Sequence, residues 1–239
     1  MPRVLLLAVL AVFAALALAG CGGDSTDDSM GDTTSTAADT VAARVYLLRD
    51  GKVWPVHRQI TKDGVPTRLL YEELQRGPTE EEKALGFTTA VPADGSDTPS
   101  KLAHAQITYT LTQSPTAPIA LPLGPVADFY AGRFRRSDFE EQTPSVLVES
   151  PLPFESVTTP LRVKGTANTF EATFQYELVD SDGKVVDQHF VTATSGTGTR
   201  GTFDFTTKAV DDVAALRVYE DSAEDGSRIH EVEIPLSSS

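Results

Sequence analysis

The stretch "TFEATFQYELVDSDGKVVDQHFVTAT", residues 169–194, decides the fold of the second half of this chain. Every second residue of its first part is apolar: Phe170, Ala172, Phe174, Tyr176 and Leu178. This period of two predicts a half-buried strand, because successive side chains of a strand point to opposite faces of the sheet. Asp182-Gly183 is a hairpin turn signal, so residues 185–194 are expected to return antiparallel.

Further short strands are predicted on both sides of this hairpin. They are "SVLVES", "LRVKGTA", "TFDFTT", "ALRVYE" and "HEVEIPL", separated by turns rich in Gly, Pro and Asp. About seven such strands predict an immunoglobulin-like sandwich. The paired cysteines and core tryptophan of antibody domains are missing from this half, so packing alone has to hold the sandwich.

The first half mixes strands and helices. "RVYLLRDGKVWPVHR" predicts a hairpin that turns at Asp50-Gly51, and Pro55 indicates that its second strand is at an edge. "PTRLLYEELQRG" has leucines at helical spacing and a glycine stop. Thr79 and Glu82 form a capping box for a short helix that ends at Gly86.

Four weaker patterns complete this half. "FTTAVP" and "IALPL" are expected to be strands, and residues 100–112 a helix. Ser137 and Glu140 offer a second capping box, for a turn of helix before Pro144. The predicted fold is therefore an α+β N-terminal domain at residues 44–143, followed by an all-β immunoglobulin-like sandwich at residues 144–239.

The N-terminus has the pattern of an export signal. Arg3 precedes a run of about fifteen apolar residues, 4–18, which is shorter than the ~20 residues of a membrane-spanning helix. Leu18, Ala19, Gly20 and Cys21 resemble the bacterial lipobox, which implies cleavage after a signal peptide at residues 1–20 and lipidation of Cys21. Two acyl chains give stable anchoring, on the extracytoplasmic side of the cell membrane. The alternative is an ordinary secretory signal with a chance cysteine.

Composition limits the partners. Residues 21–43 are expected to be a lipidated cysteine and a disordered tether, because residues 22–43 hold five Asp, no Lys or Arg, and little to bury. The whole chain has a net charge of −14. Such an acidic protein is a poor candidate for nucleic-acid binding, which needs Lys and Arg.

Two regions resemble known families. "VYLLRDGKVWPVHR", "LLYEELQRGPTEEEKALGFTTAVP" and "AQITYTLTQSP" are similar to the GerMN domain of sporulation and germination lipoproteins. Here that domain is shortened, because only residues 93–100 fill the interval where the family pattern has another strand pair. "SPLPFESVTTPLRVKGTANTFEATFQYELVDSDGKVV" and "YEDSAEDGSRIHEVEIPL" resemble the immunoglobulin-like domain of spore germination proteins. The resemblance implies an envelope interaction module and brings no catalytic residues with it.

Other motifs do not predict a reaction. "GTGTRG", residues 196–201, spells a dinucleotide fingerprint but precedes a predicted strand instead of the helix that would hold the pyrophosphate, so an interstrand loop is expected. The histidines are His57, His104, His189 and His230, and none pairs at helical spacing for zinc; the last two are expected inside strands. The acidic turns "DSDG" and "EDSAEDG" lack the spacing of a dedicated calcium loop. No cofactor or metal is predicted.

Arg133, Arg135 and Arg136 form the only basic cluster. They are a possible anion-contact patch for a wall polymer or lipid headgroup, with a solvated loop as the alternative. The sequence as a whole predicts a non-enzymatic, membrane-anchored binding or scaffold lipoprotein whose partner is an envelope protein or cell-wall polymer. The alternative is an accessory subunit or enzyme acting on peptidoglycan.

Overall fold

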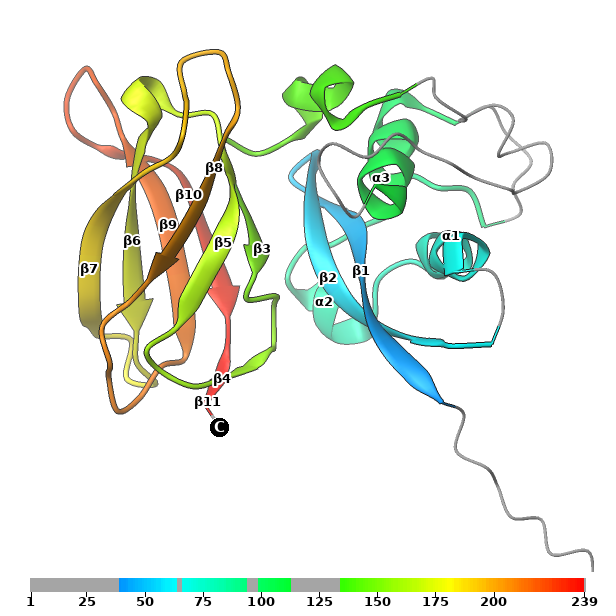
Figure 1. Cartoon of the computed structure of the whole chain (residues 1–239), viewed down its shortest axis with the longest axis horizontal. Helices are drawn as coiled ribbons and strands as arrows, with labels where there is room; N and C mark the ends of the chain where they lie inside the picture. The colour runs from blue at the N-terminus through cyan, green and yellow to red at the C-terminus, as the bar shows by residue number, and fades with distance from the viewer. Residues whose placement is uncertain (1–38, 64–65, 94–98, 113–133, 239) are drawn as a thin grey trace, which may run out of the picture. The chain divides into compact units, whose positions relative to one another are not determined.

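The computed structural model describes residues 39–63, 66–93, 99–112 and 134–238 (Figure 1). The predicted signal peptide, Cys21 and most of the tether lie outside these residues, as does the predicted strand "IALPL". Among the described helices, none combines the length and apolar character needed to cross a bilayer.

The first module begins with the predicted hairpin. Strands β1 (Thr40–Arg49) and β2 (Lys52–Thr61) pair antiparallel along their whole length, so that Leu48 faces Val53. Asp50 and Gly51 both have positive φ, at 52° and 69°, as a tight hairpin turn requires. The hairpin is confirmed, and β1 already starts at Thr40, within the predicted tether.

Helices α1 (Pro66–Arg76) and α3 (Lys101–Leu111) pack on this hairpin, and α2 (Glu80–Ala84) is joined to β2 by the ion pair between Glu82 and Arg58. The predicted capping box of α2 is confirmed, since the Thr79 hydroxyl accepts the Glu82 N–H and the Glu82 carboxylate accepts the Thr79 N–H at 2.8 Å. Ser100 caps α3, which confirms the helix expected there. The fully buried side chains include Val45, Tyr46, Leu47, Leu74, Ile107 and Tyr109.

The strand expected at "FTTAVP" is wrong apart from one bridge, between Leu48 and Thr88. Their amides and carbonyls exchange hydrogen bonds of 2.9 and 2.8 Å. Further along, the side chain of Gln106 takes the place of a neighbouring strand: its Oε1 accepts the Ala90 N–H at 2.7 Å, and its Nε2 donates to the Tyr46 carbonyl at 3.1 Å. A buried amide on α3 thus ends the ladder, which a propensity pattern does not reveal.

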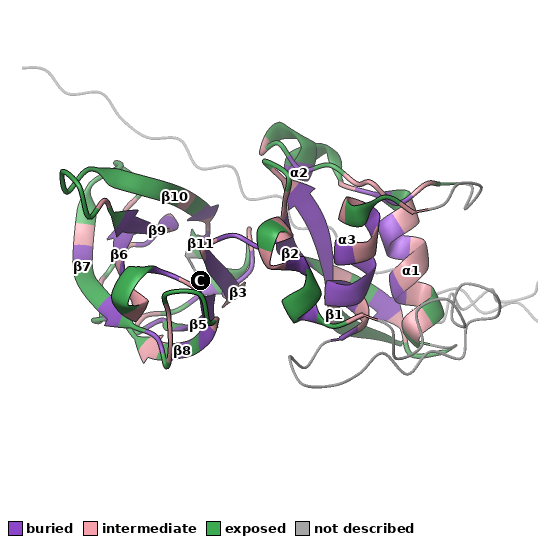
Figure 2. Ribbon diagram, turned by 90° about the horizontal axis from the view of Figure 1, so that it is seen from above, coloured by how far each residue is buried: buried purple, intermediate pink, exposed green. Residues whose placement is uncertain are grey.

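The second module is a sandwich of antiparallel strands (Figure 1). One sheet has the order β10-β9-β6-β7 and the other β3-β5-β8, while β4 and β11 pair separately. The strands are β3 (Val146–Ser150), β4 (Ser156–Val157), β5 (Arg162–Ala167), β6 (Thr173–Val179), β7 (Val185–Thr192), β8 (Gly201–Thr206), β9 (Ala215–Asp221), β10 (Arg228–Pro235) and β11 (Ser237–Ser238). Figure 2 shows that β7 and β10, the edges of the first sheet, are mainly exposed. The predicted fold class is confirmed.

The alternating strand is shorter than predicted. Phe174, Tyr176 and Leu178 are buried as expected, but Phe170 is 60% exposed and lies in the 3-10 helix η2 (Phe170–Ala172). The loop after β7 holds this turn, because the Thr197 N–H donates to the Thr169 carbonyl at 2.9 Å. Gly196 makes that approach possible, since a Cβ there would lie 2.5 Å from backbone atoms of η2.

Candidate functional site

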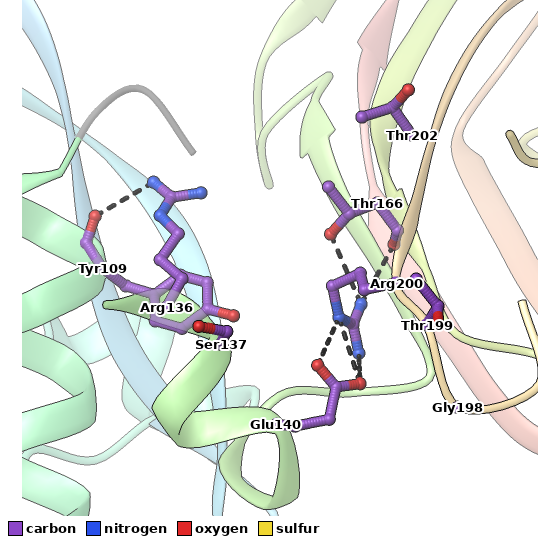
Figure 3. A pocket seen from close by; sticks show the side chains of 9 residues that line it. All are labelled: Tyr109, Arg136, Ser137, Glu140, Thr166, Gly198, Thr199, Arg200 and Thr202. Carbon is purple, nitrogen blue, oxygen red and sulfur yellow. Dashed lines mark hydrogen bonds and ion pairs between the residues drawn. The ribbon is translucent and has the colours of Figure 1, made fainter. Parts of the chain in front are cut away.

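The candidate site is a pocket of ≈ 410 Å³ beside the 3-10 helix η1 (Arg136–Gln142) (Figure 3). Residues of α3, η1, β5, β8 and the loop before β8 line it: Tyr109, Arg136, Ser137, Glu140, Thr166, Gly198, Thr199, Arg200 and Thr202. The lining therefore combines two guanidinium groups, one carboxylate and several hydroxyls.

The helix η1 does not have the cap that the sequence predicts. The carboxylate of Asp138 accepts the N–H of Arg135 at 2.7 Å, so the helix starts one residue before Ser137. Glu140, expected to close a capping box with Ser137, points to the second module instead. There its carboxylate meets Arg200, a stronger partner than a backbone amide because the hydrogen bond is between two charges.

Arg200 and Glu140 form the central ion pair of the pocket. The nitrogens Nε and Nη2 of Arg200 lie 3.0 and 2.8 Å from the two carboxylate oxygens. Nη2 also donates to the Pro144 carbonyl at 2.8 Å, and Nη1 donates to both oxygens of Thr166 at 3.3 Å. All three nitrogens of the guanidinium thus have partners within the protein.

Asn168 completes the pair. Its Nδ2 donates to Glu140 at 2.8 Å, while its Oδ1 accepts the N–H of Gly198 at 2.9 Å. Burial raises the pKa of Glu140, but the hydrogen bonds from Arg200 and Asn168 outweigh it, so this pKa is lower than its usual value. Glu140 is therefore held in the ionised form that the pair needs.

Arg136, on the other wall, is 8% exposed. It donates to the carbonyls of Tyr109 and Thr112, at 3.1 and 2.6 Å, which lie at the C-terminal end of α3. Carbonyls at a helix C-terminus lack intrahelical partners and carry the negative end of the helix dipole, so a cation is favoured there. The guanidinium carbon also lies 4.6 Å from the centre of the Tyr109 ring and 5.1 Å from that of Tyr46.

Glu149 of β3 joins Arg136 to the sandwich. Its Oε1 lies 2.8 Å from Nη1 of Arg136 and also accepts the hydroxyl proton of Tyr46. Burial and the nearby carboxylate raise the pKa of Tyr46, which keeps the phenol protonated as a donor. The carboxylate thus neutralises Arg136 in a place that solvent barely reaches.

The structure corrects one part of the predicted anion patch. Arg135 is exposed, and Arg133 lies outside the described residues. Arg136 does not fit an anion contact, because Glu149 and the helix carbonyls already surround it. The sequence analysis did not identify Glu149 or Arg200 as residues of this site. The only indication for Glu149 was its position as an acidic residue in the otherwise apolar strand "SVLVES".

The "GTGTRG" motif is an interstrand loop, as predicted. Gly201 opens β8, so a strand follows the motif where a nucleotide site would need a helix. The arginine of the motif, Arg200, is committed to Glu140. These glycines serve close backbone packing, since a Cβ on Gly201 would lie 2.3 Å from the Ser195 nitrogen.

Two of the histidines and the first acidic turn that the sequence analysis considered lie within the sandwich. His189 and His230 lie in β7 and β10 as predicted, and His230 Nδ1 lies 2.8 Å from Glu220. The first acidic turn is held by Asp180, whose carboxylate accepts the Lys184 N–H at 2.8 Å. No group of three metal-ligating side chains occurs among the described residues.

The chemistry of the pocket is therefore that of hydrogen bonding and charge pairing. Its arginines are saturated by internal acceptors, and the Thr202 hydroxyl lies 3.3 Å from that of Thr194, so the groups left over in the described lining are the hydroxyls of Ser137 and Thr199. The lining that the structure describes brings no histidine or free carboxylate beside these hydroxyls, as an activated nucleophile would require.

Comparison with known proteins supports one of the two resemblances. No curated protein and no solved structure matches the chain. A match exists to one family model, and it covers most of the sandwich, from the first residue before β3 to the turn before β10. Residues 145–227 match the model of the immunoglobulin-like domain of bacterial spore germination (Gmad2).

Proposed function

We propose that this protein is a membrane-anchored envelope lipoprotein that acts as a non-enzymatic binding or scaffold module for a cell-wall or protein partner. Two features support the proposal. The order of apolar run, Leu18-Ala19-Gly20 and Cys21 fits an export signal with a lipidation site. The match to a germination-related immunoglobulin-like domain fits a role in envelope interactions.

The scaffold role is supported mainly by the way in which the charged side chains beside the pocket are bonded within the protein. Arg136 and Arg200 each hold a carboxylate and at least one backbone carbonyl, and the partners come from segments far apart in the sequence. Groups that are saturated in this way hold elements together, whereas a catalytic group has to keep a bond free for substrate. The proposed binding surfaces are the exposed loops and edge strands that these contacts support.

Lipid anchoring is tested by growing cells that express the full chain with a radiolabelled or alkyne-tagged palmitate. The label is expected on the wild-type protein and absent from Cys21→Ala, which should stay as an uncleaved precursor. Met30→Ala, in the same segment, is the matched control and should be labelled normally. Equal labelling of the Cys21 variant would overturn the anchoring proposal.

The binding role is tested by crosslinking in intact cells. Spheroplasts and whole cells that carry the full chain would be treated with a short amine-reactive crosslinker, and the adducts identified by mass spectrometry. A reproducible adduct with an envelope protein or with wall peptide supports the proposal. Adducts with cytoplasmic proteins alone would contradict it.

A further inference from the structure

An exposed aromatic side chain occupies an unusual backbone position in the loop after β3. Phe154 has a φ of 64°, which bulky side chains rarely adopt, and 41% of it is exposed. Its N–H donates to the Pro235 carbonyl at 2.8 Å, so the conformation is tied to the end of β10. Strained positions that display an exposed ring are candidates for binding sites.

The ring borders a pocket of ≈ 390 Å³. One wall consists of the loop residues Pro153, Phe154 and Glu155 with Ser156, the first residue of β4, and the other consists of His57, Arg58, Thr79, Glu81 and Glu82. Parts of the loop after β3, of β2 and of the start of α2 thus meet around one cavity. The volume is sufficient for one extended side chain and the groups next to it.

The lining of this pocket has a net negative charge when the groups that pair with one another inside the protein are left out of the count. Nη1 and Nη2 of Arg58 lie 2.6 and 2.8 Å from the Glu82 carboxylate, and its Nε lies 3.3 Å from Glu73. Arg58 is thereby neutralised. The Glu155 carboxylate accepts the Leu152 N–H at 2.7 Å, and among the described residues neither Glu155 nor Glu81 takes part in an ion pair.

We propose that this pocket, the Phe154 pocket, binds the ammonium group of a lysine-type side chain in a peptide. A cation over an aromatic face is attracted by the ring quadrupole, and carboxylates at the rim supply charge-assisted hydrogen bonds. An anion would be repelled by Glu81 and Glu155, and a purely apolar ligand would leave them desolvated. The inference rests on the proposed binding function, because the peptide would be part of the envelope partner that the protein binds.

The test is an NMR titration of residues 22–239 with Nα-acetyl-lysine methylamide. The resonances of Phe154, Glu81 and His57 are expected to shift, and the same compound acetylated at Nε should cause no such shifts. Phe154→Gly removes the ring and is compatible with positive φ, so the fold should be kept while affinity falls at least about 5-fold, the loss of one cation–π contact. Glu81→Gln with Glu155→Gln should weaken binding further, most strongly at low salt.

Phe190→Ala is the matched control, because this ring is also exposed but lies on β7 away from the pocket lining. Its affinity should equal that of the wild type. Equal binding by the Phe154→Gly protein, or by the Nε-acetylated probe, would overturn the proposal. The titration does not depend on lipidation or on a wall partner, so it can fail while the proposed function stands, and the reverse also holds.

Discussion

The guanidinium of Arg200 forms a bidentate ion pair with the carboxylate of Glu140, with two nitrogens at 3.0 and 2.8 Å from its oxygens. The two residues are 60 positions apart in the sequence. Arg200 stands at the end of a glycine-rich loop of the sandwich, and Glu140 on the short helix η1 that precedes the first strand. The same guanidinium holds the carbonyl of Pro144. One side chain therefore fixes the segment through which the sandwich joins the first module.

Replacing Arg200 by alanine should destabilise the protein by about 1–3 kcal/mol, less than the ~3–5 kcal/mol for a fully buried pair because Glu140 is partly exposed. Urea denaturation measures the loss. Arg162→Ala is the control, since its pair with Asp204 is exposed and should contribute only ~0–1 kcal/mol. Equal losses in the two variants would refute a special role for Arg200.

Arg136→Ala should cost more, about 3–5 kcal/mol, because it takes the guanidinium away from the Glu149 carboxylate and from the last carbonyls of α3, where solvent barely reaches. Arg136→Lys keeps the charge but loses the planar fork and should recover only part of the stability. Arg135→Ala, one residue away and exposed, is expected to change stability by less than ~0.5 kcal/mol. Full rescue by lysine would show that charge alone matters at this position.

Acid should weaken the fold through Glu140 and Glu177. Burial raises the pKa of Glu177, but Arg228 and Arg217 outweigh it, so the pKa values of both carboxyls lie below the ordinary 4.5. The unfolded chain takes up these protons first, so their stabilisation is complete above pH 4.5 and is lost as pH falls through the folded-state values. Unfolding free energies measured from pH 7 to 3 should fall in this window, and less steeply for Glu140→Gln. An unchanged slope in that variant would contradict the assignment.

Gly165 has no room for a side chain. A Cβ there would lie 2.0 Å from the Leu147 carbonyl oxygen and 2.6 Å from the Phe203 ring. Gly165→Ala should therefore force β3 and β5 apart and cost at least about 2 kcal/mol, as overpacking of a tight core does. Thermal unfolding measures the effect, and Lys164→Ala on the exposed face serves as the control. A neutral Gly165→Ala protein would contradict the close approach of these strands.

Local patterns predicted most elements of this fold. Asp50-Gly51, Asp182-Gly183 and the Thr79–Glu82 capping box each act over four residues or fewer, so the sequence carries all the information that they need. The burial of Phe174, Tyr176 and Leu178 could also be predicted, because alternation with a period of two is a local property of the sequence.

The errors arose where distant side chains override a local pattern. Glu140 matched a capping box, yet Arg200 binds it, and Gln106 replaced a strand partner beside Ala90. Phe170 continued an alternation that the loop at Gly196 interrupts. Arg136 belongs to a basic cluster whose sequence is typical of a solvated patch, but in the fold its guanidinium binds the C-terminal end of α3 and Glu149. None of these contacts is visible in a single sequence, because each joins segments that only the fold brings together.

The central claim is that the protein binds an envelope partner without processing it. The most direct measurement is co-sedimentation of residues 22–239 with purified cell-wall sacculi at low and high salt, with the supernatant assayed for soluble wall fragments. The account predicts that the protein pellets with the sacculi and that no fragments are released. Release of wall fragments into the supernatant, or failure to pellet at either salt concentration together with no crosslinked envelope protein, would contradict it.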